Sequence, residues 1–255
     1  SLNNYTATLP RLNKYGEPNR FLETHRLASS IMQSAIKQAN IHREEIDVAG
    51  CLPPLVASYV SSEALAFDES VKHYQELIVA QQKHVDIFLI ETMSNISEAK
   101  AAISALNSFG IPALVSLTIT DDFSNTLRSG EKLELAVEQL TEYGASALML
   151  NCSFPESIEH ALPILARSRL PFGAYANKFK SVKELSPGST VDKLSTRHDL
   201  SINKYFDFVY RWIDIGATII GGCCEIGPNY ISHLGSELQR SGHHLISVRR
   251  SNILN

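Results

Sequence analysis

Residues 219–228 read Ile219-Ile220-Gly221-Gly222-Cys223-Cys224-Glu225-Ile226-Gly227-Pro228. The apolar run from Ala217 to Ile220 predicts a buried strand that stops at two glycines, and Gly227-Pro228 is typical of the start of a helix. Two cysteines therefore follow the carboxyl end of a strand. Adjacent cysteines bridge to each other only with strain in the peptide between them, whereas two neighbouring thiolates can bind one soft metal ion. This stretch predicts a metal site at a strand end.

A third cysteine follows another predicted strand. The run Ala147-Leu148-Met149-Leu150-Asn151-Cys152 is apolar until its last two residues. Since parallel strands end at the same edge of a sheet, Cys152 is expected to lie near Cys223 and Cys224. Three thiolates around a tetrahedral metal leave one position for an exchangeable partner.

The rest of the chain alternates predicted strands and helices. We expect seven strands, near residues 5, 48, 88, 114, 149, 174 and 219, and each is followed by a helical pattern. The helices are expected at about residues 19–40, 69–83, 97–109, 131–143, 157–167, 203–216 and 229–241, with loops at 10–18 and 178–202. The second loop is expected to lie over the ligand face. This alternation predicts a parallel α/β fold, and cysteines at two strand ends favour a barrel over an open doubly wound sheet.

Composition narrows the class of protein. The chain has 255 residues, 44% of them hydrophobic and 20% charged, which fits one barrel domain over residues 1–255. A net charge of −4 gives no electrostatic reason to expect nucleic acid or an anionic membrane as partner, so small ligands are expected. Because neither a membrane-span pattern nor a signal pattern is present, we expect a cytoplasmic protein. Four cysteines are too few for a secreted disulfide framework and suit a reducing compartment.

The chain resembles a known family, the zinc-dependent homocysteine S-methyltransferases, which are (β/α)8 barrels. The matching segments, in family order from residue 3 to about 240, are Gly221-Gly222-Cys223-Cys224, Asn151-Cys152, and the weaker Asn4-Tyr5, Ala49-Gly50, Glu91-Thr92 and Tyr175-Ala176-Asn177. One feature departs from the family, because its opening Asp-Gly-Gly strand has no counterpart here. We therefore expect a (β/α)8 TIM-type barrel that lacks its first strand, through truncation or in a variant gene product. Dimerisation is one way to cover the exposed edges.

The resemblance implies a reaction and a set of site residues. The implied zinc ligands are Cys152, Cys223 and Cys224. Glu91 is expected to hold the ammonium group of the substrate, Asn177 to orient ligands, and Tyr5 to fill the fourth metal position in the resting enzyme. The implied activity is transfer of a methyl group to the thiol of homocysteine, giving methionine. The donor is expected to be a sulfonium, S-methylmethionine or S-adenosylmethionine, with betaine as a further option.

Two other functions stay open at this point. Without the segment that lines the amino-acid pocket, the chain could be a non-catalytic zinc- or thiol-binding barrel, or an inactive truncated form. Redox switching through Cys223 and Cys224 is a third option, which a strained bridge between adjacent cysteines disfavours. The fourth cysteine, Cys51, is expected to be structural. The nine histidines form no ligand spacing and are expected at the surface: His25, His42, His73, His84, His160, His198, His233, His243 and His244.

Overall fold

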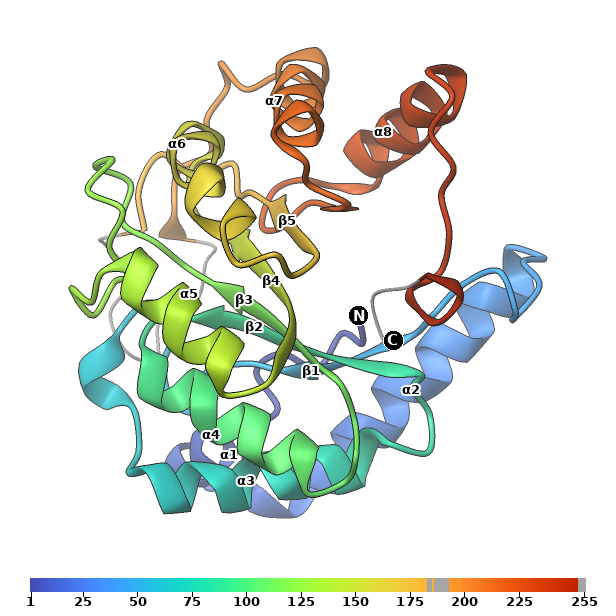
Figure 1. Ribbon diagram of the computed structural model, residues 1–255. Coiled ribbons are helices and arrows are strands. Elements are labelled where there is room, and N and C mark those ends of the chain that lie inside the picture. Colours follow the sequence, from blue (N-terminus) through green and yellow to red (C-terminus); the bar gives the residue numbers. More distant parts are fainter. Residues whose placement is uncertain (183–184, 186–192, 252–255) are drawn as a thin grey trace.

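The sheet of this protein is parallel and open. The computed structural model describes residues 1–182, 185 and 193–251. Within them, six strands lie in the order in which they occur along the chain. They are β1 (Ala49–Leu52), β2 (Ile87–Met93), β3 (Ala113–Leu117), β4 (Ala145–Asn151), β5 (Phe172–Tyr175) and β6 (Ile219–Ile220). Each strand pairs with the next one in parallel, forming a half-barrel (Figure 1).

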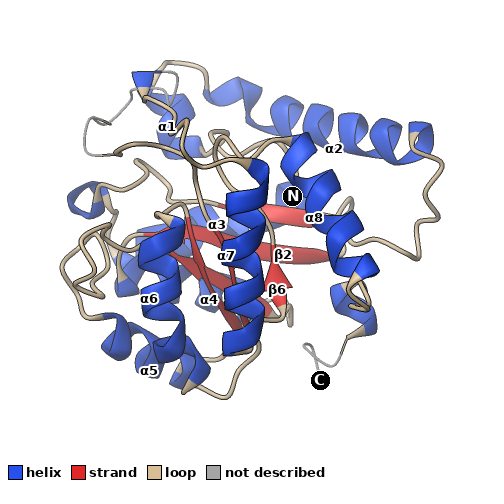
Figure 2. Cartoon of the chain, turned by 90° about the horizontal axis from the view of Figure 1, so that it is seen from above, coloured by secondary structure: helices blue, strands red, loops and turns tan. Residues whose placement is uncertain are grey.

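Helices lie around the strands (Figures 1 and 2). They are α1 (Leu9–Lys14), α2 (Phe21–Gln38), α3 (Phe67–Gln81), α4 (Ile96–Asn107), α5 (Leu133–Glu142), α6 (Pro155–Ala166), α7 (Ile202–Ile215) and α8 (Pro228–Arg240). The last seven agree with the predicted helices to within about two residues at each end, because their apolar residues recur at helical spacing.

The core fills the space between the sheet and these helices. All five residues of β3 are buried, which is typical of a parallel strand covered on both faces. On α4, the buried positions include Ala99, Ala101, Ala102 and Ala105, whose small side chains let the helix approach its neighbours closely. The Asn95 side chain caps the same helix by accepting a hydrogen bond from the Glu98 amide at 2.8 Å. The prediction of a parallel α/β fold is confirmed.

One glycine allows the last strand to pair. Gly173 of β5 lies opposite Ile219 of β6, and a Cβ atom at Gly173 would lie 1.8 Å from the Ile219 carbonyl oxygen. Only glycine lets the two backbones come this close. The pairing carries the residues that follow β6 to the same edge of the sheet as the residues that follow β4.

The amino-terminal segment differs from its prediction. A strand was predicted near residue 5, but residues 2–8 form turns, and a backbone bond from the Leu2 amide to the Ala49 carbonyl at 2.9 Å joins them to the sheet. The Asn4 side chain instead donates to Gln81 Oε1 at 2.9 Å. The loop predicted at residues 10–18 contains helix α1, whose first turn is capped by Thr8. Side-chain bonds to residues far away in the chain take the place of a strand ladder here, so the described sheet has six strands and not seven.

The prediction that the histidines lie at the surface is wrong for one of them. His25 was expected at the surface, but it is 1% exposed, and its ring nitrogens bond to the Ala7 carbonyl at 2.9 Å and to Asn4 Nδ2 at 2.8 Å. A histidine whose two nitrogens are both satisfied can be buried without penalty. The strand predicted to stop at the two glycines ends at Ile220, so both cysteines lie in the turn that follows it, as expected.

Of the predicted loop at 178–202, residues 183–184 and 186–192 lie outside the described residues. Among the described strands, β6 pairs with β5 alone, so the sheet stays open between β6 and β1. None of the described helices is long and apolar enough to cross a membrane.

Candidate metal centre

Three cysteines meet at the carboxyl edge of the sheet. Cys152 follows β4 directly and has a left-handed backbone with φ 49°, which is uncommon for a residue other than glycine. Cys223 and Cys224 follow β6 after two glycines, and a Cβ at Gly222 would lie 2.2 Å from Ile226 Cγ2, so this turn is too tight for another residue. The three sulfur atoms lie within 4.8 Å of one another.

Two of the three separations between the sulfurs fit a tetrahedral metal. Cys224 Sγ lies 3.7 Å from Cys152 Sγ and 3.9 Å from Cys223 Sγ. Metal–sulfur bonds of about 2.3 Å at tetrahedral angles separate two sulfurs by about 3.8 Å. Both measured separations match this value. The three cysteines predicted from the sequence therefore come together as a set that can hold one metal ion.

The sulfurs of Cys152 and Cys223 are joined as a disulfide, and Cys224 is a free thiol. Metal ligation needs thiolates, so this centre can bind a metal through all three sulfurs only after the disulfide is reduced. The redox alternative considered from the sequence paired the adjacent Cys223 and Cys224. The structure instead pairs residues from two different strand ends, which avoids strain in the peptide between neighbours.

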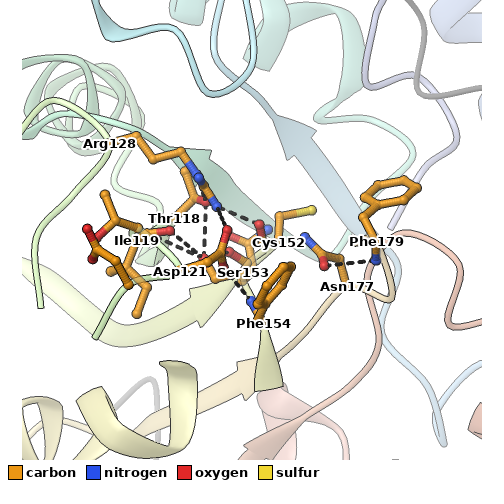
Figure 3. Close-up of polar contacts among 12 residues, drawn as sticks. Thr118, Ile119, Asp121, Arg128, Cys152, Ser153, Phe154, Asn177 and Phe179 are labelled. Carbon is orange, nitrogen blue, oxygen red and sulfur yellow. Dashed lines mark hydrogen bonds and ion pairs between the residues drawn. The ribbon is translucent and has the colours of Figure 1, made fainter. Parts of the chain in front are cut away.

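Asn177 lies beside Cys152 (Figure 3). Its backbone amide donates to the Ser153 carbonyl at 3.2 Å, and its Oδ1 accepts from the Phe179 amide at 3.2 Å. Its Nδ2 is buried and has no partner among the described residues. A buried amide without a partner costs free energy unless a ligand or an ion completes it. A thiolate sulfur or a bound ligand would accept this hydrogen bond.

A buried amide links the ends of two strands near the site. Asn151, the last residue of β4, accepts from the Thr92 amide at 3.0 Å and donates to Thr92 Oγ1 at 2.8 Å. Thr92 has a left-handed backbone with φ 63°. Cys152 follows Asn151 in the chain, and Glu91 precedes Thr92. The two bonds therefore hold Cys152 and Glu91 in place at the same edge of the sheet.

The cysteines open onto a cavity of about 880 Å³. It is lined by Ser1, Leu2, Asn3, Tyr5, Thr6, Pro10, Arg11, Leu12, Lys14, Tyr15, Val56, Ala57, Ser58, Tyr59, Glu91, Thr92, Cys152, Leu185, Cys223 and Cys224. Glu91 is 9% exposed, and burial raises the pKa of its carboxyl group. A buried carboxylate favours a cationic partner, so Glu91 is placed where an ammonium group could bind.

Tyr5 lines this cavity, but its described bond is not to a cysteine. Its hydroxyl bonds to Ser58 Oγ at 2.9 Å, and burial raises the pKa of the phenol well above its usual value. The hydroxyl therefore stays protonated at neutral pH. Cys51 is buried and free, and burial raises the pKa of its thiol, so this cysteine is unreactive.

Two other residues near the centre were not predicted from the sequence. Tyr59 lines the cavity and, like Cys224, packs against the apolar cluster of Phe179, Val182 and Leu194. The Arg128 guanidinium lies 5.1 Å from the centre of the Tyr59 ring. Arg128 also donates to Thr118 and Asp121, both at 3.0 Å (Figure 3). Neither residue lies in a motif, and each reaches the site from a loop. Only the folded chain brings them together.

Comparison with known proteins identifies the family. The family model of the homocysteine S-methyltransferases matches residues 2–238. Homocysteine S-methyltransferase 1 of Arabidopsis thaliana is 28% identical over 172 residues, covering 66% of this chain and 51% of that protein. Homocysteine S-methyltransferase of Escherichia coli is 30% identical over 152 residues, covering 58% of this chain and 46% of that protein. The chain thus spans about half the length of the curated relatives it matches.

A solved structure shows the same fold. The metallated form of the homocysteine methyltransferase MmuM from Escherichia coli matches with a TM-score of 0.68 at 23% identity, covering 92% of this chain and 78% of that chain. The half-barrel therefore corresponds to part of a TIM-type barrel, as predicted. Together with the family model, which covers most of the chain, this fold shows that the protein belongs to the homocysteine S-methyltransferase family.

Proposed function

We propose that this protein is a zinc-dependent methyltransferase that moves a methyl group from a sulfonium donor to the thiol of homocysteine. One observation carries the proposal: the sulfurs of Cys152, Cys223 and Cys224 converge on the wall of a cavity, and Cys224 lies at tetrahedral spacing from the other two. Membership of the family supports the substrate. S-Methylmethionine and S-adenosylmethionine are the proposed donors, since each carries an activated methyl group.

Zinc bound by the three thiolates would leave one position for the homocysteine thiol and would lower its pKa, so that the sulfur is a thiolate near neutral pH. The residues of the chain position this nucleophile. Glu91 is proposed to hold the ammonium group of homocysteine by a charge-assisted hydrogen bond. Asn177 is proposed to orient the ligands through its free Nδ2. Tyr5 is proposed to fill the fourth position before substrate binds, after leaving Ser58.

The reaction balances without a further reactant. The homocysteine thiol loses its proton to solvent, and its sulfur forms a bond to the methyl carbon of the donor. The bond between that methyl carbon and the donor sulfur breaks, and its electron pair stays on the donor sulfur. The products are methionine and a neutral thioether. The cavity volume lies in the range of sites for drug-sized ligands, about 300–1,000 Å³, which leaves room for an amino acid and its donor.

Elemental analysis is the first test. Protein purified under reducing conditions without added metal should contain about one zinc per chain, and calorimetry should then show homocysteine binding to the zinc form. Methionine should appear when S-methylmethionine is added. If the protein contains zinc but neither binds homocysteine nor forms methionine, the results would favour the alternative, a non-catalytic metal-binding barrel. Absence of zinc with all three thiols titratable would overturn the proposal.

A further inference from the structure

Arg11 brings a positive charge to the wall of the cavity. It lies on α1, is partly buried, and lines the same cavity as Glu91 and the three cysteines. Other arginines of the chain, such as Arg128 and Arg197, form ion pairs with carboxylates. Arg11 forms no ion pair with any residue that the structure describes, and its side-chain hydrogen bonds go to neutral oxygens. Its charge is therefore available to a ligand.

The guanidinium group of Arg11 is held in place without using all of its donors. Nη2 donates to the Pro54 carbonyl at 2.8 Å and lies 3.5 Å from Ser58 Oγ. The guanidinium carbon lies 5.4 Å from the centre of the Tyr5 ring, within the range of a cation–π interaction. Nε is buried and has no partner among the described residues. A buried donor without a partner costs free energy, and a ligand oxygen would remove this cost.

Helix α1 fixes the position from which this side chain extends. The Thr8 hydroxyl donates to the Leu55 carbonyl at 2.6 Å and accepts from the Arg11 amide at 3.4 Å. Pro54, Leu55 and Ser58 all belong to the segment after β1, so the backbone and the guanidinium of Arg11 are both attached to one wall of the cavity. A group that is already fixed loses little conformational entropy when a ligand binds. Arg11 is thus preorganised.

Arg11 and Glu91 place opposite charges in one cavity. Both act on the Tyr5 hydroxyl: burial is the main cause that raises its pKa, the Arg11 charge lowers it, and the Glu91 charge raises it. The cavity wall also carries Lys14, which is exposed. An α-amino acid carries an ammonium group and a carboxylate on the same carbon atom. A wall that offers both a carboxylate and a guanidinium matches these two charges.

We propose that Arg11 binds the α-carboxylate of an amino-acid ligand in this cavity, that of homocysteine or that of the sulfonium donor. Its planar guanidinium can donate charge-assisted hydrogen bonds to both oxygens of a carboxylate. The inference rests on the proposed function, because it names a further contact of the substrates proposed there. Arg11 then selects ligands that carry a carboxylate over simple thiols and amines.

Calorimetry on the reduced, zinc-loaded protein tests this contact. Arg11→Gln removes the charge, and Arg20→Gln is the matched control, since Arg20 is exposed and pairs with Glu17 at 3.0 Å. Arg11→Gln should bind zinc normally. Its affinity for the ligand whose carboxylate Arg11 holds should fall roughly 10- to 150-fold, because a charge-assisted hydrogen bond is lost. Arg20→Gln should bind both amino acids as the wild type does.

Homocysteine and S-methylmethionine are titrated separately, because each carries an α-carboxylate. A loss of affinity for homocysteine alone places the carboxylate of homocysteine on Arg11. A loss for S-methylmethionine alone places the carboxylate of the donor there. A loss for both shows that either amino acid can use the same guanidinium. Unchanged affinity for both amino acids would overturn the inference and leave the proposed function intact.

Ligands without a carboxylate separate binding from folding. 3-Aminopropane-1-thiol is homocysteine with a hydrogen atom in place of the carboxylate, and (3-aminopropyl)dimethylsulfonium is the same change in S-methylmethionine. The affinities of these two analogues should be equal in the wild type and in Arg11→Gln. If Arg11→Gln loses as much affinity for an analogue as for the amino acid, Arg11 acts through the fold, and the inference is wrong.

Arg11→Lys decides the matter if Arg11→Gln does not fold. It keeps the charge and a donor for the Pro54 carbonyl but lacks the planar group that can bind both carboxylate oxygens. It should lose affinity for the same amino acid by a smaller factor and bind the analogue unchanged. Wild-type affinity of Arg11→Lys for both amino acids would count against the inference. A wild type that binds neither amino acid would overturn the proposed function, and the inference with it.

Discussion

Asn151 and Thr92 join the ends of β4 and β2 across the intervening strand through two hydrogen bonds, from the Thr92 amide to Asn151 Oδ1 at 3.0 Å and from Asn151 Nδ2 to Thr92 Oγ1 at 2.8 Å. Both residues are buried. Their neighbours in the chain, Cys152 and Glu91, belong to the proposed metal and substrate sites. The pair therefore sets the distance between these two sites.

Replacing this amide tests that role. Asn151→Ala leaves the Thr92 amide buried without a partner, and we expect the free energy of unfolding to fall by about 1–3 kcal/mol. Asn151→Asp keeps an acceptor for the Thr92 amide. It should lose less stability at low pH than at neutral pH, because the protonated carboxyl group can also donate to Thr92. Urea denaturation measures both variants. Full stability of Asn151→Ala would show that the pair does not hold the strand ends.

Cys152 and Cys51 form a matched pair of buried cysteines. Cys152→Ala removes one of the three sulfurs, so we expect the variant to lose bound zinc and homocysteine methylation. Cys51→Ala removes a thiol outside the cluster and should retain about one zinc per chain. Elemental analysis after reduction and methionine formation are the measurements. If Cys152→Ala retains both zinc and activity, the proposed mechanism is wrong.

Glu91→Gln separates substrate binding from metal binding. The variant keeps the size of the side chain and removes its charge, so it should bind zinc normally. A charge-assisted hydrogen bond contributes about 1.5–3 kcal/mol, and its loss should weaken homocysteine binding roughly 10- to 150-fold. Calorimetry on the zinc-loaded protein measures this. An unchanged affinity would remove Glu91 from the substrate site.

Glu98 should make the stability of the protein depend on pH. Burial raises the pKa of its carboxyl group, although the Leu55 amide at 2.9 Å and the Tyr74 hydroxyl at 3.3 Å bond to it. Since the folded pKa lies above the unfolded value, the folded state binds the proton more tightly. This contribution to stability is therefore present below about pH 4.5 and is lost as the pH rises through the folded pKa.

Glu98→Gln measures this contribution. Its free energy of unfolding, relative to that of the wild type, should increase as the pH is raised from about 4.5 to 7.5, because the variant has no carboxyl group to ionise in the core. The exposed Glu63 gives the control variant, Glu63→Gln, which should follow the wild type across this range. A difference between Glu98→Gln and the wild type that does not change with pH would contradict the argument.

The amino-acid sequence by itself determined the order of the helices and strands and the fact that the three cysteines lie close together. Apolar periodicity is a local property, so it predicted the seven longer helices and the parallel strands without knowledge of the neighbours. Parallel strands end at one edge, and for that reason Cys152 and the pair after β6 could be expected in one place.

Tertiary structure decided the rest through contacts between residues far apart in the chain. The buried position of α3 brings Gln81 to Asn4, and Asn4 bonds to Gln81 instead of joining a strand ladder. For this reason the strand predicted near residue 5 does not form. No local pattern predicts the burial of His25, the pairing of Cys152 with Cys223, or the packing of Tyr59 and Cys224 against one apolar cluster. Such contacts form only when loops and packed helices have fixed positions, because their free energy depends on partners that the neighbouring sequence does not contain.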